Sequence, residues 1–282
     1  MKAGRHAAAL KALHKAHELL PDEWLCNYLL GEVERQTGQL TLAIATFNEV
    51  LTQVPQETTV LLSLAETHLA QGRSELSTGY ISRSSVSFLS AIAVSLDLAD
   101  SSPGFRRLAL KTIADALFAL SDFSEFSDSD LATETLSRIA SLHDDKVDER
   151  ISGIIDYPLL QNDSAIDGLA ALRLATATYS LRLSLFTGDE EGIGSAWHDL
   201  GISVSRLGSA TQSQVVKEKA EKDAIEFVRK ALLADPGNPV FWNAFGNLNF
   251  MTRPMIAQHA YIRALEHNSK VNGYPLFIPL LI

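Results

Sequence analysis

The fold class is decided by residues 24–55, WLCNYLLGEVERQTGQLTLAIATFNEVLTQVP, where small, large and helix-ending residues stand at fixed places. Counted from Trp24 as position one, they are Leu30 at seven, Gly31 at eight, Gly38 at fifteen, Ala43 at twenty, Phe47 at twenty-four and Pro55 at thirty-two. Small residues at eight and twenty allow two antiparallel helices to approach closely, and the phenylalanine fills the space between them. Gly38 permits the left-handed turn that ends the first helix, and Pro55 cannot continue the second.

The same marks recur one period of 34 residues away in both directions, which is typical of the tetratricopeptide (TPR) repeat. Earlier in the chain they are Gly4, Ala9, Leu13, Ala16 and Pro21, so the sequence starts in the middle of a repeat. Later, Leu64 and Ala65 take positions seven and eight, and Gly72 takes fifteen. The partner helix, YISRSSVSFLSAIAVSLDLA, is expected to run past the usual length to about Ala99.

A second set of repeats lies near the C-terminus. Its first-helix marks are Trp197, Leu200 and Gly201, and its second-helix marks are Ala224, Val228, Ala231 and Pro236. The two helices place position one at Gly194 and at Ser205, which predicts an insertion of 11 residues around GSATQSQVVKE, either as a loop or as an extension of one helix. The next repeat opens with Trp242, Phe245 and Gly246. Its second-helix marks, Ala257, Tyr261 and Ala264, stand one residue before the places that the repeat spacing gives them.

The middle of the chain keeps the helical period but loses the 34-residue spacing. Leu108, Ile113, Leu117 and Leu120 are predicted to share one side of a helix, and Asp130 is a plausible N-cap for a helix carrying Leu131, Leu136, Ile139 and Leu142. The sequence therefore predicts an all-α superhelix as a single array over 1–282. Regular repeats cover about 1–99 and 194–270, a divergent helical segment covers about 103–190, and 271–282 form an atypical tail.

Composition narrows the function classes. Lys and Arg total 24 against 34 Asp and Glu. The resulting net charge of −10 disfavours binding of nucleic acid or anionic lipid over the general surface of the protein. The single cysteine, Cys26, excludes an internal disulfide framework and suits a reducing, intracellular compartment; its default interpretation is a buried, inert thiol. The longest apolar run, residues 86–99, is too short to span a bilayer and predicts a buried helix.

No group of residues forms a convincing reaction centre. His14, His17 and Glu18 could make a weak metal site, but a solvated helix face is the preferred interpretation. His198 and Asp199 are adjacent, so we expect them to point apart. GIGSAW, after Glu191, is interpreted as a helix start and not as a phosphate cradle. We therefore expect no enzyme activity, no cofactor, no metal and no small-molecule ligand.

TPR arrays act as surfaces, because stacked hairpins make a groove for a partner's peptide or helix. Chaperone-binding TPR modules hold a C-terminal carboxylate with Lys at position five and Asn at position nine of a first repeat. Here those positions are Tyr28 and Glu32, then Leu62 and Glu66. A glutamate would repel the carboxylate, so this role is disfavoured.

Beyond the generic repeat, the order of segments resembles the TPR scaffold subunit of the superkiller (Ski) complex, in a fungal-type version. The stretches that carry the resemblance are PDEWLCNYLLGEVERQTGQLTLAIATFNEVLTQVP, VLLSLAETHLAQG, SAWHDLGISVSRL, NPVFWNAFGNLNF and AQHAYIRALEHNSKV. The resemblance implies a non-enzymatic scaffold that joins a DExH-box RNA helicase and WD40-propeller subunits and supports exosome-dependent 3′-to-5′ mRNA decay. It also implies a cytoplasmic location, with a nuclear pool as the alternative, and no direct contact with RNA.

Two departures from that family stand at the ends. The start within a repeat suggests that N-terminal neighbours are missing, and VNGYPLFIPLLI places Pro275 and Pro279 where a first helix is expected. We expect this tail to be foreign to the family, for example a retained intron. The alternative function is a different TPR adaptor, and an RNA-binding helical repeat is a third class that the acidic charge disfavours.

Overall fold

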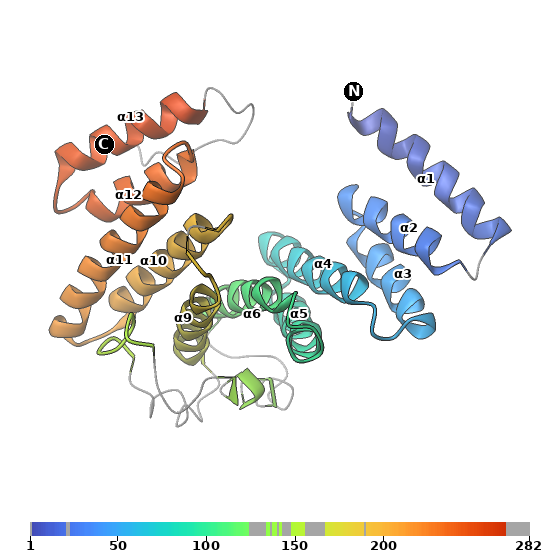
Figure 1. Cartoon of the computed structure of the whole chain (residues 1–282), viewed down its shortest axis with the longest axis horizontal. Helices are drawn as coiled ribbons and strands as arrows, with labels where there is room; N and C mark the ends of the chain where they lie inside the picture. The colour runs from blue at the N-terminus through green and yellow to red at the C-terminus, as the bar shows by residue number, and fades with distance from the viewer. Residues whose placement is uncertain are drawn as a thin grey trace. The chain divides into compact units, whose positions relative to one another are not determined.

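The computed structural model describes residues 2–20, 23–123, 134–135, 137–139, 141–142, 148–155, 167–188 and 190–268 (Figure 1). Throughout these residues the regular structure is helical, with one isolated bridge between Ser152 and Ile155. The predicted all-α class is confirmed. Pro21, Asp130, Leu131, Leu136 and the tail 271–282 lie outside the described residues.

The chain forms two compact units. Unit 1 comprises Met1–Leu142 and Ser164–Ala175, and unit 2 comprises His143–Asp163 and Thr176–Ile282. Unit 1 holds α1 (Lys2–Leu19), α2 (Trp24–Gln36), α3 (Leu40–Gln53), α4 (Thr58–Ser77), α5 (Ile81–Ser101) and α6 (Arg106–Leu120). Unit 2 holds α10 (Ile193–Ala210), α11 (Gln214–Ala234), α12 (Pro239–Asn249) and α13 (Pro254–Asn268), and α9 (Gly168–Ser184) supplies residues to both units.

The α2–α3 hairpin shows why the spacing of small and large residues matters. Phe47 is fully buried against Gly31, and a Cβ added to that glycine would lie 2.6 Å from the ring. Gly38 turns the chain with a φ of +81°, a conformation that other residues adopt at a cost. Val60 and Leu64 of α4 join the same core as Phe47, so α4 covers the α2–α3 hairpin.

The α4–α5 hairpin corrects the assignment of Gly72. This residue lies inside α4 and not at its end, and the turn belongs to Gly79, with a φ of +84°. Gly72 packs against Phe88, 2.7 Å from an added Cβ, as Gly31 does against Phe47. The hairpin is therefore longer at the end away from its turn. α4 begins fourteen residues before Gly72, whereas α2 begins seven residues before Gly31. Seven residues are about two helical turns, so the lengthening leaves the apolar face where it was.

The 11-residue insertion is neither a loop nor an extension of one helix, because α10 and α11 share it. Beyond Gly201, α10 continues for nine residues, against five beyond Gly31 in α2. In α11 fourteen residues precede Val228, against seven before Phe47 in α3. The turn keeps its three residues, and in the added length Gly208 faces Ala220, whose Cβ lies 2.5 Å from a Cβ placed on the glycine.

The last hairpin is regular. Asn238 caps α12 by accepting a hydrogen bond from the backbone N–H of Val240 at 3.0 Å, and Pro239 takes the first helical position. Tyr261 packs over Gly246 at 2.6 Å from an added Cβ, one residue earlier in the spacing than Phe47 over Gly31.

Two central helices complete unit 1. In α6, Ile113, Leu117 and Leu120 are fully buried, but Leu108 is 46% exposed, so its predicted place beside them is wrong. Leu108 lies five residues before Ile113, which places it on another side of the helix, and the buried stripe starts at Ala109. Within the described part of the chain α5 alone has the length and apolar content to cross a membrane, yet 56% of its apolar 18-residue stretch is buried in the protein.

Candidate functional site

The first surface to consider is formed by α2, α4 and α6 in unit 1. Three leucines on these first helices stay about half exposed: Leu25 at 48%, Leu29 at 45% and Leu108 at 46%. Between them Tyr28 of α2 reaches α4, with its hydroxyl 3.5 Å from Ser63 Oγ. Leu25 and Leu29 belong to α2 and Leu108 to α6, and exposed apolar side chains of this kind are typical of protein interfaces.

Ion pairs join the same three helices. Arg35 of α2 donates to Glu32 at 2.8 Å and to Glu66 of α4 at 3.1 Å. Burial acts to lower the pKa of Arg35, but the hydrogen bond and charge of Glu32, with the charge of Glu66, outweigh it and raise the pKa. The two glutamates at position nine thus share one arginine, in a place where a carboxylate-binding module carries asparagine.

Farther along, α4 and α6 enclose a small pocket of about 240 Å³. Arg73 of α4 and Lys111 of α6 both donate to Asp115, at 3.2 and 3.1 Å. Leu69 and Leu108 line the same pocket. We name this combination of leucines and paired charges, on α2, α4 and α6, the inner face of unit 1.

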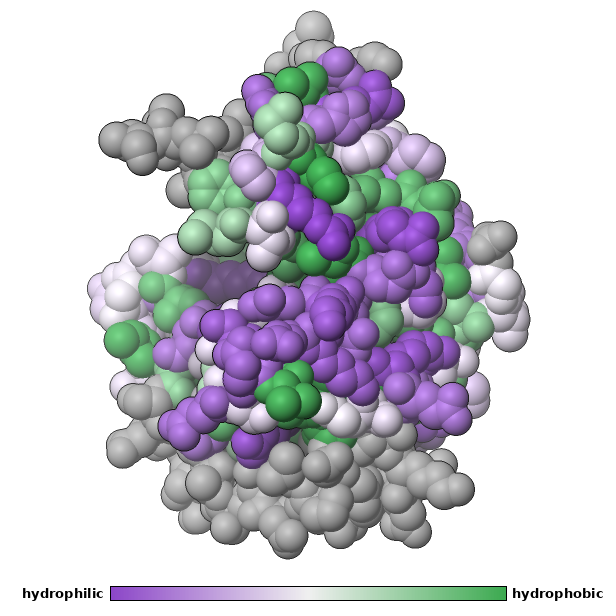
Figure 2. All heavy atoms as spheres, turned by 90° about the vertical axis from the view of Figure 1, so that its left-hand side faces the viewer, coloured by the Kyte–Doolittle hydropathy of each residue, from purple (hydrophilic) through white to green (hydrophobic). Residues whose placement is uncertain are grey.

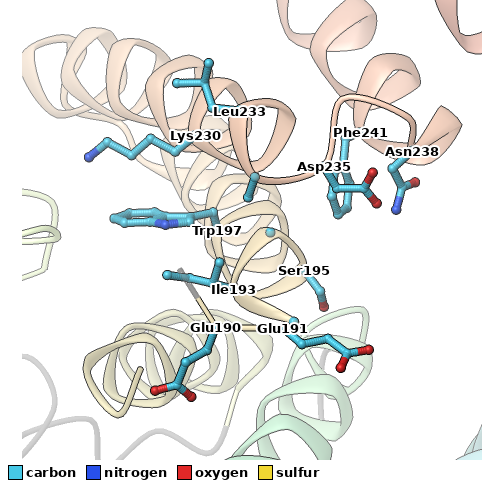
Figure 3. A pocket seen from close by; sticks show the side chains of 13 residues that line it. Glu190, Glu191, Ile193, Ser195, Trp197, Lys230, Leu233, Asp235, Asn238 and Phe241 are labelled. Carbon is cyan, nitrogen blue, oxygen red and sulfur yellow. The ribbon is translucent and has the colours of Figure 1, made fainter. Parts of the chain in front are cut away.

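Unit 2 has its own pocket of about 750 Å³, between the start of α10, the end of α11 and the start of α12. Figure 3 shows Lys230 and Leu233 of α11 on one side of Trp197, with Glu190 and Glu191 on the other. The Lys230 ammonium lies 4.4 Å from the Trp197 ring centroid, a cation–π distance. Carboxylates, a cation and apolar side chains are mixed here, so the pocket favours no one ligand chemistry.

The glycine pair at the mouth of this pocket begins a helix. Gly192 has a φ of +88° and stands as the N-cap, and α10 starts at Ile193. This is the interpretation that the sequence favoured over a phosphate cradle.

His198 and Asp199 do not point apart, so that prediction is wrong. His198 Nδ1 lies 3.1 Å from one carboxylate oxygen of Asp199, and the other oxygen accepts from Arg182 of α9 at 2.9 Å. An aspartate side chain can turn back along its own helix, and here the nearly buried Arg182 fixes it. Ser195 donates to Asp199 at 3.3 Å and not to the histidine, which is not the order of a nucleophile, base and acid. The cluster connects α9 to α10.

The other residues considered for chemistry are His17 and Cys26, and neither belongs to a reaction centre in the described residues. His17 Nδ1 lies 2.7 Å from the amide oxygen of Asn27, so it ties α1 to α2. Cys26 is partly exposed, so its interpretation as a buried thiol is wrong. Among the residues that the structure describes, no three His, Cys, Asp or Glu side chains gather closely enough to hold a metal ion.

The residues predicted to pack the repeats fall into three groups. Fourteen are buried: Leu30, Gly31, Ala43, Phe47, Leu64, Ala65, Leu200, Gly201, Ala224, Ala231, Gly246, Ala257, Tyr261 and Ala264. Six are half-buried: Ala9, Leu13, Ala16, Trp24, Trp197 and Trp242. Gly38, Pro55 and Pro236 are exposed at turns. Leu64 and Ala65 sit on α4 but not opposite the phenylalanine of their hairpin, because Gly72 holds that place.

Comparison with known proteins finds similarity to the repeat family and to longer relatives. The tetratricopeptide repeat family profile matches residues 1–58. Superkiller protein 3 of Schizosaccharomyces pombe is 26% identical over 261 residues, which are 92% of this chain and 18% of that protein. Tetratricopeptide repeat protein 37 of Xenopus laevis is 25% identical over 93% of this chain and 16% of its own length. Superkiller complex protein 3 of Mus musculus is 23% identical over 92% of this chain and 15% of its own length.

The chain therefore matches the tetratricopeptide repeat model at residues 1–58 and is similar to Superkiller protein 3 over most of its own length, so the predicted resemblance is confirmed. It spans less than a fifth of the length of these relatives.

Proposed function

We propose that this chain works as a non-enzymatic TPR scaffold in a superkiller-type complex. In this proposal it holds a DExH-box RNA helicase and WD40-propeller subunits, so that the complex supports exosome-dependent 3′-to-5′ mRNA decay in the cytoplasm. The observation that carries the proposal is the similarity to Superkiller protein 3 over 92% of the chain, irregular centre included. A single array over 1–282 is part of the same proposal.

The inner face of unit 1 supports a role in binding protein and argues against RNA. Leu25 and Leu29 offer apolar area to a partner. The cations beside them are already paired, Arg35 with two glutamates and Arg73 with Asp115. Phosphate binding depends on Lys and Arg that can replace counterions, so paired cations on an acidic protein are poorly suited to it.

Affinity purification of the tagged chain, followed by mass spectrometry, tests the proposal. We expect a DExH-box helicase and a WD40 protein to be recovered together. A variant with Leu25→Asp and Leu29→Asp should lose them, because it places charge on exposed apolar positions of α2. The matched control is Val215→Asp, a 78% exposed position on α11, which belongs to unit 2.

Three results separate the candidates. Loss of both partners in the α2 variant alone supports the scaffold role and its surface. Recovery of other proteins without helicase or WD40 subunit from the folded wild-type chain overturns the role in a superkiller-type complex and favours a different TPR adaptor. Equal recovery by all three chains removes the inner face as the binding surface.

A further inference from the structure

The pocket between α4 and α6 in unit 1 has the size of one side chain. Its volume is about 240 Å³, which is below the roughly 300–1,000 Å³ of pockets that hold drug-sized ligands. Leu69 and Ala70 of α4 and Leu108 of α6 give it apolar walls. Leu69 is buried, but Leu108 is 46% exposed, so an apolar side chain placed in the pocket would remove that leucine from water.

Charged side chains distinguish the two ends of this pocket. Arg73 of α4 meets Lys111 and Asp115 of α6 at one end. Glu66 stands seven residues before Arg73 on α4, which is about 10 Å along the helix. Glu66 pairs with Arg35 of α2 at 3.1 Å. The pocket therefore has a cationic end at Arg73 and an anionic end at Glu66.

Arg73 can change its partner at little cost. Lys111 donates to both carboxylate oxygens of Asp115 at 3.1 Å, so Asp115 stays paired without Arg73. Arg73 adds one hydrogen bond of 3.2 Å, and its side chain is 58% exposed. An ion pair this exposed contributes little to stability. Within the described residues Arg73 makes that single hydrogen bond, which leaves most of the five N–H donors of its guanidinium for another acceptor.

We propose that this pocket receives an apolar side chain of a partner protein, and that an Asp or Glu next to it in the partner binds Arg73. A carboxylate matches the planar guanidinium, which can donate two parallel hydrogen bonds to it. Glu66 repels a carboxylate at the other end, so the partner segment has one favoured direction. The inference rests on the role in protein binding proposed above and names the chemistry of the bound segment, a leucine-type residue beside an acidic one.

One exchangeable arginine does not make this surface a site for nucleic acid. A phosphate chain is held by several cations at once. Lys111 stays with Asp115, and Arg35 is shared by two glutamates. A single carboxylate needs only one guanidinium, so Arg73 suits an acidic peptide residue.

Methyl NMR of the full chain, with labelled leucine and valine methyl groups, tests the proposal. The probes are acetyl-Gly-Leu-Glu-Leu-Gly-amide and the same peptide with glutamine in place of glutamate. Titrated to several millimolar, the glutamate peptide should shift the methyl signals of Leu69 and Leu108. We expect it to bind about threefold more tightly than the glutamine peptide, which is the size of effect that an exposed ion pair gives.

The methyl signals of Val215 on α11 are the internal control. Val215 is 78% exposed, and Figure 2 shows a broad hydrophilic band with single hydrophobic residues on the side of the molecule that includes this helix. A valine that is open to the peptide but has no such pocket beside it reports unspecific contact. We expect its signals to stay in place during the titration.

Two variants at exposed positions locate the contact. Arg73→Gln should bind both peptides equally, at the affinity that the wild type has for the glutamine peptide. Arg83→Gln, at an arginine of α5 that lies over the Tyr80 ring, should keep the threefold preference. The proposal is overturned if the wild type binds both peptides equally, if Arg73→Gln keeps the preference, or if Leu69 and Leu108 do not respond.

The peptide titration and the purification of partners can fail separately. A preference for the glutamate peptide in a chain that recovers neither helicase nor WD40 subunit overturns the superkiller-type role and supports the pocket. Recovery of both subunits by a chain without that preference supports the role and overturns the pocket.

Discussion

Single glycines set the distance between the helices of each hairpin. Gly72 is the clearest test, because its sequence position suggested a turn and its structure shows a close packing contact with Phe88. In Gly72→Ala the added methyl group meets a fully buried ring that cannot swing away. Overpacking costs about 1–3 kcal/mol, against a gain of about 1 kcal/mol in helix propensity. We expect a net loss of up to about 2 kcal/mol in the free energy of unfolding.

Chemical denaturation measures this loss, and two further variants locate its cause. Gly104→Ala is the control, because no atom lies within 4 Å of its Cβ. Phe88→Leu should reduce the cost of Gly72→Ala, since the two residues are in contact and their effects are not additive. Additive effects would show that Gly72 does not pack against this ring.

His68 makes the stability of unit 1 depend on pH. Burial lowers the pKa of His68 below its ordinary value of 6.5, and the charge of Glu75 opposes this shift only in part. Below pH 6.5 the unfolded chain therefore binds a proton that the folded chain does not, so stability falls as the pH falls. In His68→Gln this contribution is absent.

Urea unfolding between pH 7.5 and pH 5.5 checks the sign. The wild type should lose more stability over this range than His68→Gln does. This holds whatever the difference in the free energy of unfolding between the two proteins at pH 7.5. The same substitution at the exposed His14 is the control. Parallel profiles for the wild type and His68→Gln would contradict the assignment.

At the scale of the element, the lengthened hairpins show what the sequence could and could not predict. The marks from Trp24 to Pro55 predicted α2 and α3 well, because each mark has one mechanical reason at one spacing. The seven added residues at the start of α4 are about two turns, so the apolar pattern continues unchanged and Gly72 falls at position fifteen by the count of the sequence. The eleven residues in α10 and α11 were visible as a mismatch, but their division between two helices was not.

The segment 148–155 was missed for a different reason. Its isoleucines follow neither the helical nor the strand period, and its contacts with Trp197 and Lys219 connect residues far apart in the sequence. The signal that could have indicated it was Ile-Ser-Gly-Ile-Ile, an apolar cluster around a glycine within a charged stretch.

The division of the insertion predicts the outcome of two deletions of equal size. Removing residues 207–210 from α10 and 214–220 from α11 keeps the turn, with Ser213 as the N-cap, and leaves the contact between Gly201 and Val228 intact. We expect helical content per residue to be retained with a moderate loss of stability. Removing the contiguous residues 208–218 also takes away the turn, so the two helices cannot reverse and the hairpin should unfold.

Circular dichroism and thermal unfolding distinguish the two chains. Similar behaviour in both would mean that the added length is not shared between the helices as the structure has it. The split deletion also removes Lys219, which donates to the backbone carbonyl of Ser152, so it should loosen residues 148–155. The release of Arg150 from Trp197 would then change the tryptophan fluorescence.

At the scale of the whole molecule, α9 determines whether the two units unfold together. Its first part, with the buried Ala170 and Ala171, belongs to unit 1, and its second part, with the buried Tyr179 and Leu183, belongs to unit 2. Unfolding either unit removes packing from one half of a continuous helix, and helix formation is cooperative along its length. We therefore expect the free energies of the two units to be coupled, as in neighbouring repeats of an array.

The tryptophans allow each unit to be followed separately, because Trp24 lies in unit 1 and Trp197 and Trp242 lie in unit 2. Chains that keep only Trp24 or only Trp242, with phenylalanine at the other positions, should unfold with coincident midpoints in urea. Leu110→Ala, which opens a cavity in α6 and costs about 2–5 kcal/mol, should shift both midpoints although it lies in unit 1 alone. A helix-breaking Ala175→Pro at the boundary within α9 should separate them, since proline removes the hydrogen bond that carries the helix across that point. If the midpoints already differ in the wild type, the units fold independently and the array predicted over 1–282 is two structural domains.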